Sequence, residues 1–185
     1  MSTREAIIEE ADYLIRDKGY NAFSYADLSK AIGIKNASIH YHFPSKSDLG
    51  IAVVQKHLLG LAELRQEKRD LSPLEQLEAF FSIYTKAKSN QKICLVGALA
   101  TDFHTIEDTV QVQLKILADQ VLNWVTEILV LGQGQGIFHF TIEPRTKAML
   151  IISNMLAIVQ LIRLTQIEDF ERVKAAIIFE LTNPL

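Results

Sequence analysis

The chain has 185 residues, of which 49% are hydrophobic and 22% charged, and its formal net charge at pH 7 is −3. This length and apolar content allow one or two compact domains with a buried core and exclude an intrinsically disordered chain. The slight negative charge excludes a protein covered in polyanion-binding surface, so any nucleic-acid site must be local.

Several features predict a soluble, cytoplasmic protein. Cys94 is the single cysteine, so no intrachain disulfide can form, which fits a reducing compartment. The N-terminal segment is acidic and amphipathic and lacks the basic start and apolar run of a signal peptide. The most apolar stretch, residues 148–162, is interrupted by polar side chains and is shorter than the roughly 18 residues that a membrane span needs.

The chain begins with a predicted amphipathic helix of structural character. Ser2 and Glu5 have the spacing of a capping box, and Gly19 is placed to end the helix. Its apolar face carries Ile7, Ala11, Leu14 and Ile15. We expect this face to pack against two shorter helices, giving a three-helix unit.

The next segment predicts a short helix followed by a tight turn. Ser24 and Asp27 form a second capping-box pattern, which opens a helix over residues 25–31. Gly33 then breaks the helix, because glycine enters the left-handed region at no steric cost. With the helix that follows, this pattern is a helix-turn-helix signature.

The second short helix has an apolar side and a polar side. Asn36 is a good N-cap for it, and Pro44 cannot continue it. The residues expected in the core are Ile34, Ala37, Ile39 and Phe43. The side chains left for solvent are all hydrogen-bond donors, namely Lys35, Asn36, Ser38, Tyr41 and His42.

The charge around this helix is one-sided. No carboxylate occurs over residues 30–47, whereas three lysines do, and such a surface suits a polyanion. A capping box formed by Ser45 and Asp48 places Lys46 in the first turn of the next helix, where the macrodipole disfavours a cation. A bound phosphate would reverse that penalty; the alternative is a solvated lysine at a small cost.

Many of the first residues match one known pattern. The run HYHFPSK over residues 40–46 is its most specific part. The other matching positions are Gly19, Tyr20, Ser24, Asp27, Leu28, Ala31, Gly33, Ile34 and the remainder of Ala37 to Leu49. Over about the first fifty residues the chain resembles the DNA-binding domain of TetR-family transcriptional regulators. It departs from the family pattern at Ala37, commonly glycine, and at His40, commonly tyrosine.

This resemblance implies roles for individual residues on DNA. The side chains expected to approach base edges or the backbone in the major groove are Lys35, Asn36 and Ser38. The side chains expected to hold phosphates are Tyr41, His42 and Lys46, with Ser24 adding a contact from the start of its helix.

No metal, cofactor or nucleotide site is expected. His40 and His42 are two positions apart, about 200° around a helix, so they cannot share one ion. The glycine-rich run over residues 132–136 lacks the following Lys-Ser/Thr and the preceding strand of a phosphate loop.

The rest of the chain predicts long helices. We expect a fourth helix from Ser45 to about Arg69, and a fifth that is opened by the Ser72–Glu75 capping box and closed at Asn90 and Gln91. A buried helix over Ile93–Phe103 and a long helix from Asp108 to about Gly132 should follow. An extended linker over Ile137–Ile142 should then lead to an eighth helix, from Pro144 to Leu164, and to a ninth, capped by Asp169. The inner stripe of the fourth helix is expected to be Leu49, Val53 and Leu59. This helix would connect the DNA-reading unit to the later domain.

The eighth helix is apolar on more than one side, which predicts a partner. Its apolar residues include Met149, Leu150, Ile151, Ile152, Met155, Leu156, Ile158, Val159, Leu161 and Ile162. A terminal hairpin covers only one face within its own chain, so two hairpins meeting across a two-fold axis would form a four-helix interface. The resemblance implies the same homodimer, which would read a roughly palindromic site.

The resemblance also implies a small-molecule effector, which would bind in the C-terminal core. Candidate pocket residues are Phe80, Tyr84, Cys94, Phe103, His104 and Trp124, although aromatics at helical spacing more often serve packing. Lys92 lies two residues before Cys94, so a redox or electrophile sensor is an alternative to an inert thiol.

Together these features predict an all-α chain of about nine helices, with a helix-turn-helix domain over residues 1–48 and an effector-binding and dimerisation domain over residues 49–185. The expected function is a ligand-responsive repressor. One alternative is a DNA-bound structural or interaction protein that ignores ligands. Another, an enzyme or small-molecule carrier, is not expected, because no nucleophile–base pair, carboxylate pair or metal-ligand spacing supports it.

Overall fold

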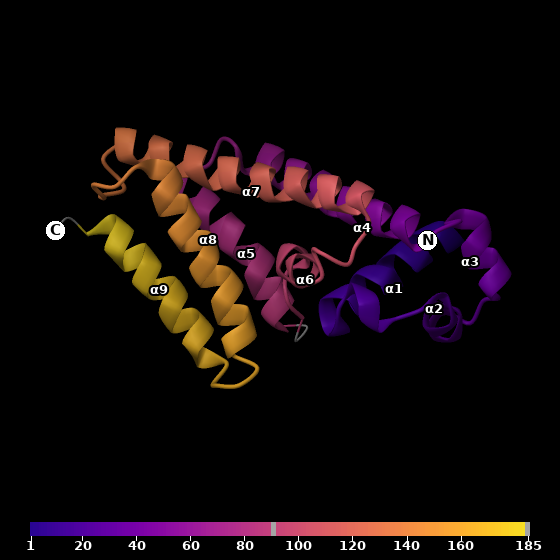
Figure 1. The fold of residues 1–185 in the computed structure, drawn as a ribbon. Helices are drawn as coiled ribbons and strands as arrows, with labels where there is room; N and C mark the ends of the chain where they lie inside the picture. The colour runs from indigo at the N-terminus through magenta and orange to yellow at the C-terminus, as the bar shows by residue number, and fades with distance from the viewer. Residues whose placement is uncertain (90–91, 184–185) are drawn as a thin grey trace. The chain divides into compact units, whose positions relative to one another are not determined.

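The computed structural model describes residues 1–89 and 92–183, and over these ranges the fold is all helical (Figure 1). Its α-helices are α1 (Thr3–Lys18), α2 (Tyr25–Ile32), α3 (Asn36–His42), α4 (Lys46–Lys68), α5 (Pro73–Ser89), α6 (Leu95–Thr101), α7 (Asp108–Gly134), α8 (Pro144–Leu161) and α9 (Glu168–Thr182). A short 3₁₀ helix, Tyr20–Ala22, follows α1. The expected all-α class is confirmed. No helix in the described ranges has both the length and the apolar character to cross a membrane.

Capping boxes start four helices where the sequence predicts them. In each, a serine hydroxyl accepts from a backbone N–H three residues on, and the carboxylate there accepts from the serine N–H. The pairs are Ser2 with Glu5, Ser24 with Asp27, Ser45 with Asp48, and Ser72 with Glu75. These local signals confirm the expected starts of α1, α2, α4 and α5.

Two predicted N-caps are wrong by one or two positions. Lys35 occupies the N-cap of α3, without a side-chain capping bond, and Asn36 is the first helical residue. Ile167 likewise occupies the N-cap of α9, and Asp169 lies in the first turn, where its carboxylate accepts from Arg172 at 3.0 Å. An acidic side chain is favourable anywhere in the first turn of a helix, so the presence of Asp169 did not by itself identify the N-cap of α9.

Other helix ends also differ from the predictions. α7 continues to Gly134, because the residue that adopts a left-handed φ, of 69°, is Gly136 and not Gly132. α8 ends at Leu161, three residues before the predicted Leu164. The end predicted for α5 at Asn90 and Gln91 lies outside the described residues.

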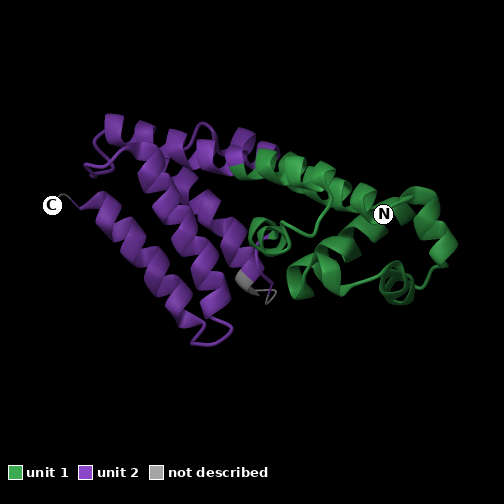
Figure 2. Cartoon of the chain, in the orientation of Figure 1, with its two compact units in different colours: residues 1–60, 95–118 green, residues 61–94, 119–185 purple. Residues whose placement is uncertain are grey.

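The chain divides into two compact units (Figure 2). Unit 1 contains residues 1–60 and 95–118, and unit 2 contains residues 61–94 and 119–185. Compactness thus groups α6 and the first part of α7 with the N-terminal helices. The predicted boundary after residue 48 separates a DNA-binding domain from an effector-binding and dimerisation domain by function, and it stays a prediction.

The core of unit 1 is built on α1, which packs against α2, α3 and α6. All four residues of its predicted apolar face are buried: Ile7, Ala11, Leu14 and Ile15. The helix-turn-helix also buries Ile39 and Phe43, as expected.

Two apolar residues predicted to face this core are exposed instead. Ala37 is two positions from Ile39, about 200° around the helix, so both cannot face the core. Leu59 is six positions after the buried Val53, about 240° around α4, and is 66% exposed.

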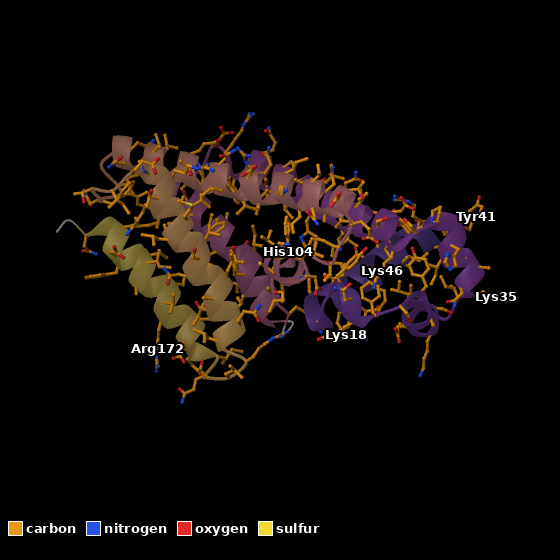
Figure 3. All side chains as sticks on the ribbon, viewed as in Figure 1. Lys18, Lys35, Tyr41, Lys46, His104 and Arg172 are labelled. Atoms are coloured by element: carbon orange, nitrogen blue, oxygen red, sulfur yellow. The ribbon has the colours of Figure 1, made fainter. Side chains whose placement is uncertain are left out.

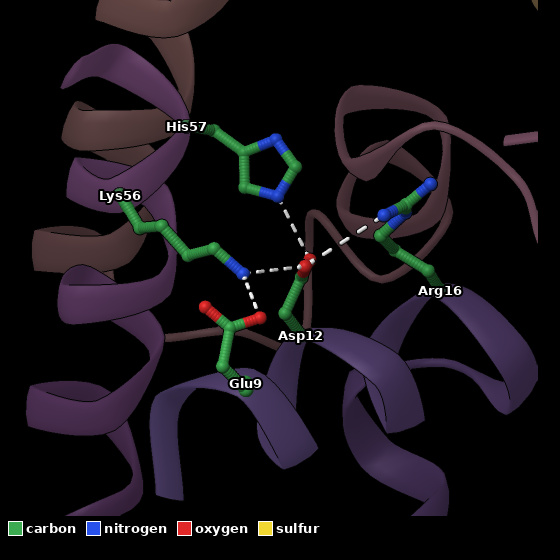
Figure 4. A network of polar contacts seen from close by, with 5 residues as sticks. All are labelled: Glu9, Asp12, Arg16, Lys56 and His57. Carbon is green, nitrogen blue, oxygen red and sulfur yellow. Dashed lines mark hydrogen bonds and ion pairs between the residues drawn. The ribbon is translucent and has the colours of Figure 1, made fainter. Parts of the chain in front are cut away.

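A buried carboxylate joins α1 to α4 within unit 1 (Figure 4). Asp12 lies 2.8 Å from His57 Nε2, 3.1 Å from Lys56 Nζ and 3.6 Å from an Arg16 nitrogen. Lys56 also pairs with Glu9. Burial by itself would raise the pKa of Asp12, but the hydrogen bond and charge of His57, with Arg16 and Lys56, lower it to about 2.

Unit 2 has an aromatic core and a C-terminal hairpin. α8 packs against α5 and α9, and Lys147 of α8 donates to Glu180 of α9 at 2.6 Å. The segment over residues 137–142 forms no strand, as expected; the His139 N–H donates to the Leu181 carbonyl at 2.7 Å. Phe138 within this segment is buried against α7 at Gly132.

Candidate nucleic-acid interface

The solvent face of α3 carries the donor side chains that the sequence predicted for DNA. Lys35, Asn36 and Tyr41 are exposed, while Ser38 and His42 are partly exposed. Tyr41 is 83% exposed, with its ring edge-on to His42 at 5.1 Å. Figure 3 shows Lys35 and Tyr41 at the outer side of this helix. The structure thus brings four of the seven predicted DNA-binding residues together on α3 and places a fifth, Lys35, at the N-cap of this helix.

The turn before α3 fixes how that helix leaves α2. Gly33 adopts a left-handed φ of 76°, and its N–H donates to the Ser29 carbonyl at 2.9 Å. The Ser29 hydroxyl donates to the Ile34 carbonyl at 2.6 Å. These contacts close the corner between the two helices.

Tyr25 fixes the other end of α3, and sequence reasoning missed this role. The single proton of its hydroxyl is shared between the carbonyl oxygens of Phe43, at 2.9 Å, and Ser45, at 2.6 Å. Its ring lies edge-on to His40 at 4.8 Å. Burial, with the nearby Asp48 carboxylate, raises the pKa of Tyr25 to about 12, so the hydroxyl remains a donor at neutral pH. The one available signal is Pro44, which ends α3 and leaves carbonyls beside it in need of a donor.

Ser24 lies at the exposed start of α2, with its hydroxyl in the capping box. The hydroxyl donates to Asp27 Oδ2 at 2.7 Å, and the hydrogen bonds from Ser24 lower the pKa of Asp27. This acid remains charged at neutral pH. A phosphate near Ser24 would therefore lie next to a carboxylate.

Lys46 is only partly exposed and turns inward from the α3 surface (Figure 3). Its ammonium donates to the Phe23 carbonyl at 2.6 Å and lies over the rings of Phe23 and Tyr20, at 4.3 and 4.8 Å from their centroids. In this conformation, Lys46 is bound to its own unit.

The predicted pocket residues fall in both units. Phe80, Tyr84, Cys94 and Trp124 are buried in unit 2, where the Phe80 ring lies 5.4 Å from Tyr84 and 6.2 Å from Trp124. Burial raises the pKa of Tyr84, and the nearby Cys94 adds to this effect. In unit 1, Phe103 is partly exposed and contacts His104, which is exposed, and Lys115.

A short capped helix, a glycine turn and an exposed donor-rich second helix define a helix-turn-helix nucleic-acid-binding protein. Comparisons with known proteins give the family. A profile described as "Bacterial regulatory proteins, tetR family" matches residues 7–53.

Solved structures match nearly the whole chain. A TetR transcriptional regulator from Legionella pneumophila is 36% identical, with a TM-score of 0.86 and 96% coverage of both chains. A TetR-family regulator from Agrobacterium tumefaciens is 31% identical, with a TM-score of 0.88 and 97% coverage of both chains. The chain therefore belongs to the TetR family and is a DNA-binding transcriptional regulator, and the expectation that it is not an enzyme is confirmed by this membership.

Two curated relatives carry functional descriptions. The HTH-type transcriptional repressor DhaR of Mycobacterium sp. (strain GP1) is 21% identical over 154 residues, covering 82% of this chain and 77% of DhaR. The negative transcriptional regulator IcaR of the icaADBC biofilm operon in Staphylococcus aureus is 39% identical over 46 residues, a quarter of each chain.

Proposed function

We propose that the protein is a ligand-responsive repressor that binds a palindromic operator as a homodimer. The observation that carries this proposal is the solvent face of α3, where exposed donors lie in a stretch without carboxylates over residues 30–47. The description of DhaR and IcaR as a repressor and a negative regulator supports repression. Because its proposed target is operator DNA, the protein would act in the cytoplasm.

On this proposal, α3 enters the major groove. Base edges or the adjacent backbone are contacted by Lys35, Asn36 and Ser38. Phosphates are held by Tyr41, His42, Lys46 and Ser24. Tyr25 acts indirectly, because it holds the carbonyls between α3 and α4.

The homodimer forms through α8 and α9. Their exposed apolar residues are Met149, Leu150, Leu161 and Phe179, and the loop between the two helices adds Leu164 and Ile167. A monomer would leave this surface in water, whereas a second copy would cover it across a two-fold axis. Two copies would also set two α3 helices on one face of the duplex.

The effector enters the unit 2 core, with Phe80, Tyr84, Cys94 and Trp124 as its predicted lining. Trp124 is the single tryptophan, so its fluorescence reports events in that core. A panel of apolar aromatic compounds would be titrated while both Trp124 fluorescence and operator affinity are followed. Compounds that quench Trp124 and weaken operator binding support ligand response; an operator affinity that no compound changes supports the alternative, a ligand-independent DNA-bound protein.

The experiment that tests the operator is a selection from a random duplex library. The full chain is used to enrich bound duplexes, and the enriched sequences are aligned. We expect an inverted repeat with half-sites about one helical turn, or a multiple of it, apart. Enrichment of no sequence, or of a single half-site, contradicts a dimeric operator-binding protein.

A further inference from the structure

The ammonium of Lys46 has an internal binding place within unit 1. It donates to the Phe23 carbonyl at 2.6 Å and lies over two aromatic faces, those of Phe23 and Tyr20. A cation over an aromatic face is attracted by the ring quadrupole, more strongly as water is removed. We call this place, formed by the Phe23 carbonyl and the two rings, the lysine cage.

The floor of the cage is fixed by residues far away in sequence. The Tyr20 N–H donates to Asp102 Oδ2 at 2.8 Å, and the Tyr20 hydroxyl donates to Glu107 Oε2 at 3.1 Å. Beside them, the Asn21 amide donates to the Thr105 hydroxyl at 2.6 Å. The segment between α6 and α7 therefore grips the 3₁₀ helix that follows α1.

The same two carboxylates also act on the charge of Lys46. Burial in the cage lowers the pKa of Lys46, and the charges of Glu107, Asp102 and Asp27 oppose that effect. The cage removes water from an ammonium, and the carboxylates offset part of that cost. Neutralising either carboxylate would make the inward position of Lys46 less favourable.

We propose that Asp102 and Glu107 are positioning residues that hold Lys46 in the lysine cage and so withhold its ammonium from DNA phosphate. The inference rests on the proposed function, in which Lys46 binds a phosphate. On this inference the ammonium leaves the cage to reach a phosphate, so the phosphate and the cage compete for it. The turn between α6 and α7 thereby sets how much of the operator affinity Lys46 supplies.

The test is a double-mutant cycle on operator affinity, measured by fluorescence anisotropy with a duplex from the selection. Glu107→Gln removes the charge while its amide oxygen still accepts from Tyr20, and Asp102→Asn does the same at the backbone N–H. Each is expected to tighten binding by about twofold to fivefold, as for a partly exposed charge interaction. In the Lys46→Gln background neither should change affinity.

A matched control separates an effect exerted through Lys46 in the cage from the general repulsion between a carboxylate and DNA. Asp108 follows Glu107 in sequence and is exposed. Asp108→Asn should have the same small effect with or without Lys46→Gln. Tyr20→Phe keeps the ring and the Glu107 charge and removes only the hydroxyl bond, so it should tighten binding less than Glu107→Gln does.

The outcomes are distinct. Equal tightening by Glu107→Gln in both backgrounds, or no tightening by either carboxylate variant, overturns the inference. A parent chain that binds no selected duplex overturns the proposed function instead. Thermal unfolding of each variant shows that it is folded before its affinity is compared.

Discussion

The hydroxyl of Tyr25, at the start of α2, donates a 2.6 Å hydrogen bond to the carbonyl oxygen of Ser45, the residue before α4. The same hydroxyl holds the Phe43 carbonyl, so one side chain fixes the chain on both sides of Pro44. The position of α3 relative to α4 therefore depends on a residue that need not contact DNA itself.

Replacing Tyr25 with Phe should weaken operator binding more than it weakens the fold. The ring can still lie against His40, but two carbonyls lose the one donor they share, at a cost of about 1 kcal/mol or slightly more in unfolding free energy. The end of α3 then loses its fixed position, and several contacts on DNA weaken together. Urea denaturation and anisotropy titration measure the two effects. Unchanged operator affinity would show that Tyr25 does not position α3.

The buried carboxylate of Asp12 predicts a pH-dependent stability. Its pKa in the folded chain is about 2, below its ordinary value of 3.8, so the folded state binds fewer protons than the unfolded state between these values. Its contribution, on the order of 2 kcal/mol, is complete above about pH 4 and is lost as the pH falls through about 2.

Asp12→Asn should therefore lower the free energy of unfolding on the order of 2 kcal/mol at pH 7 and by much less near pH 2. Glu9→Gln is the matched control, because Glu9 also pairs with Lys56 but its side chain is 54% exposed; its effect should be below about 1 kcal/mol. Denaturant unfolding of the parent and both variants across acidic pH gives the comparison. A gap between parent and Asp12→Asn that stays constant with pH contradicts the assignment.

Two glycines of α7 predict opposite effects of the same substitution. A Cβ on Gly132 would lie 2.1 Å from the ring of the buried Phe138, whereas a Cβ on Gly134 would meet nothing within 4 Å. Gly132→Ala should destabilise the protein by about 1–3 kcal/mol through overpacking. Gly134→Ala should be neutral or should stabilise it by up to about 1 kcal/mol, because alanine is the better helix former. Thermal unfolding measures both, and equal effects would contradict the packing of Phe138 on α7.

The proposed dimer predicts that a charge on α8 separates the subunits. Leu150 is half exposed on α8, and Leu150→Glu would bury a carboxylate in the interface without a partner. Sedimentation velocity should show a monomer for this variant and a dimer for the parent. Leu59→Glu on α4 is the matched control and should remain dimeric. A dimeric Leu150→Glu variant would place the interface elsewhere.

Much of the fold could be predicted because its signals are local. A serine with an acid three residues on defines a helix start, and the left-handed turn at Gly33 follows from one residue type. The donor-rich character of α3 is likewise readable, since residues 35–42 are rich in hydrogen-bond donors and contain no carboxylate. The buried apolar face of α1 follows from the same periodicity.

The contacts that position the site are not local, and the sequence did not predict them. Tyr25 reaches carbonyls 18 and 20 residues away, and Tyr20 reaches acids 82 and 87 residues away. The inward conformation of Lys46 depends on those contacts. A helical sequence pattern therefore predicts the backbone position of Lys46 but not the direction of its side chain. Leu59 illustrates a different limit of the sequence pattern. It is apolar, but its position around α4 points it away from the buried side of the helix.

The central claim, that the solvent face of α3 reads DNA, is tested most directly by anisotropy titration of a selected operator duplex and a scrambled duplex at several salt concentrations. The variants are Tyr41→Ala, Lys35→Ala and the control Arg69→Ala, which removes an exposed cation from unit 2. Operator binding should be tighter than scrambled binding and should fall with salt. Tyr41→Ala should weaken it by about 1.5 kcal/mol or more per subunit, as for a hydrogen bond to a charged group. Lys35→Ala should also weaken it, while Arg69→Ala leaves it unchanged. Equal binding to both duplexes, or losses no larger for the α3 variants than for Arg69→Ala, would contradict the account.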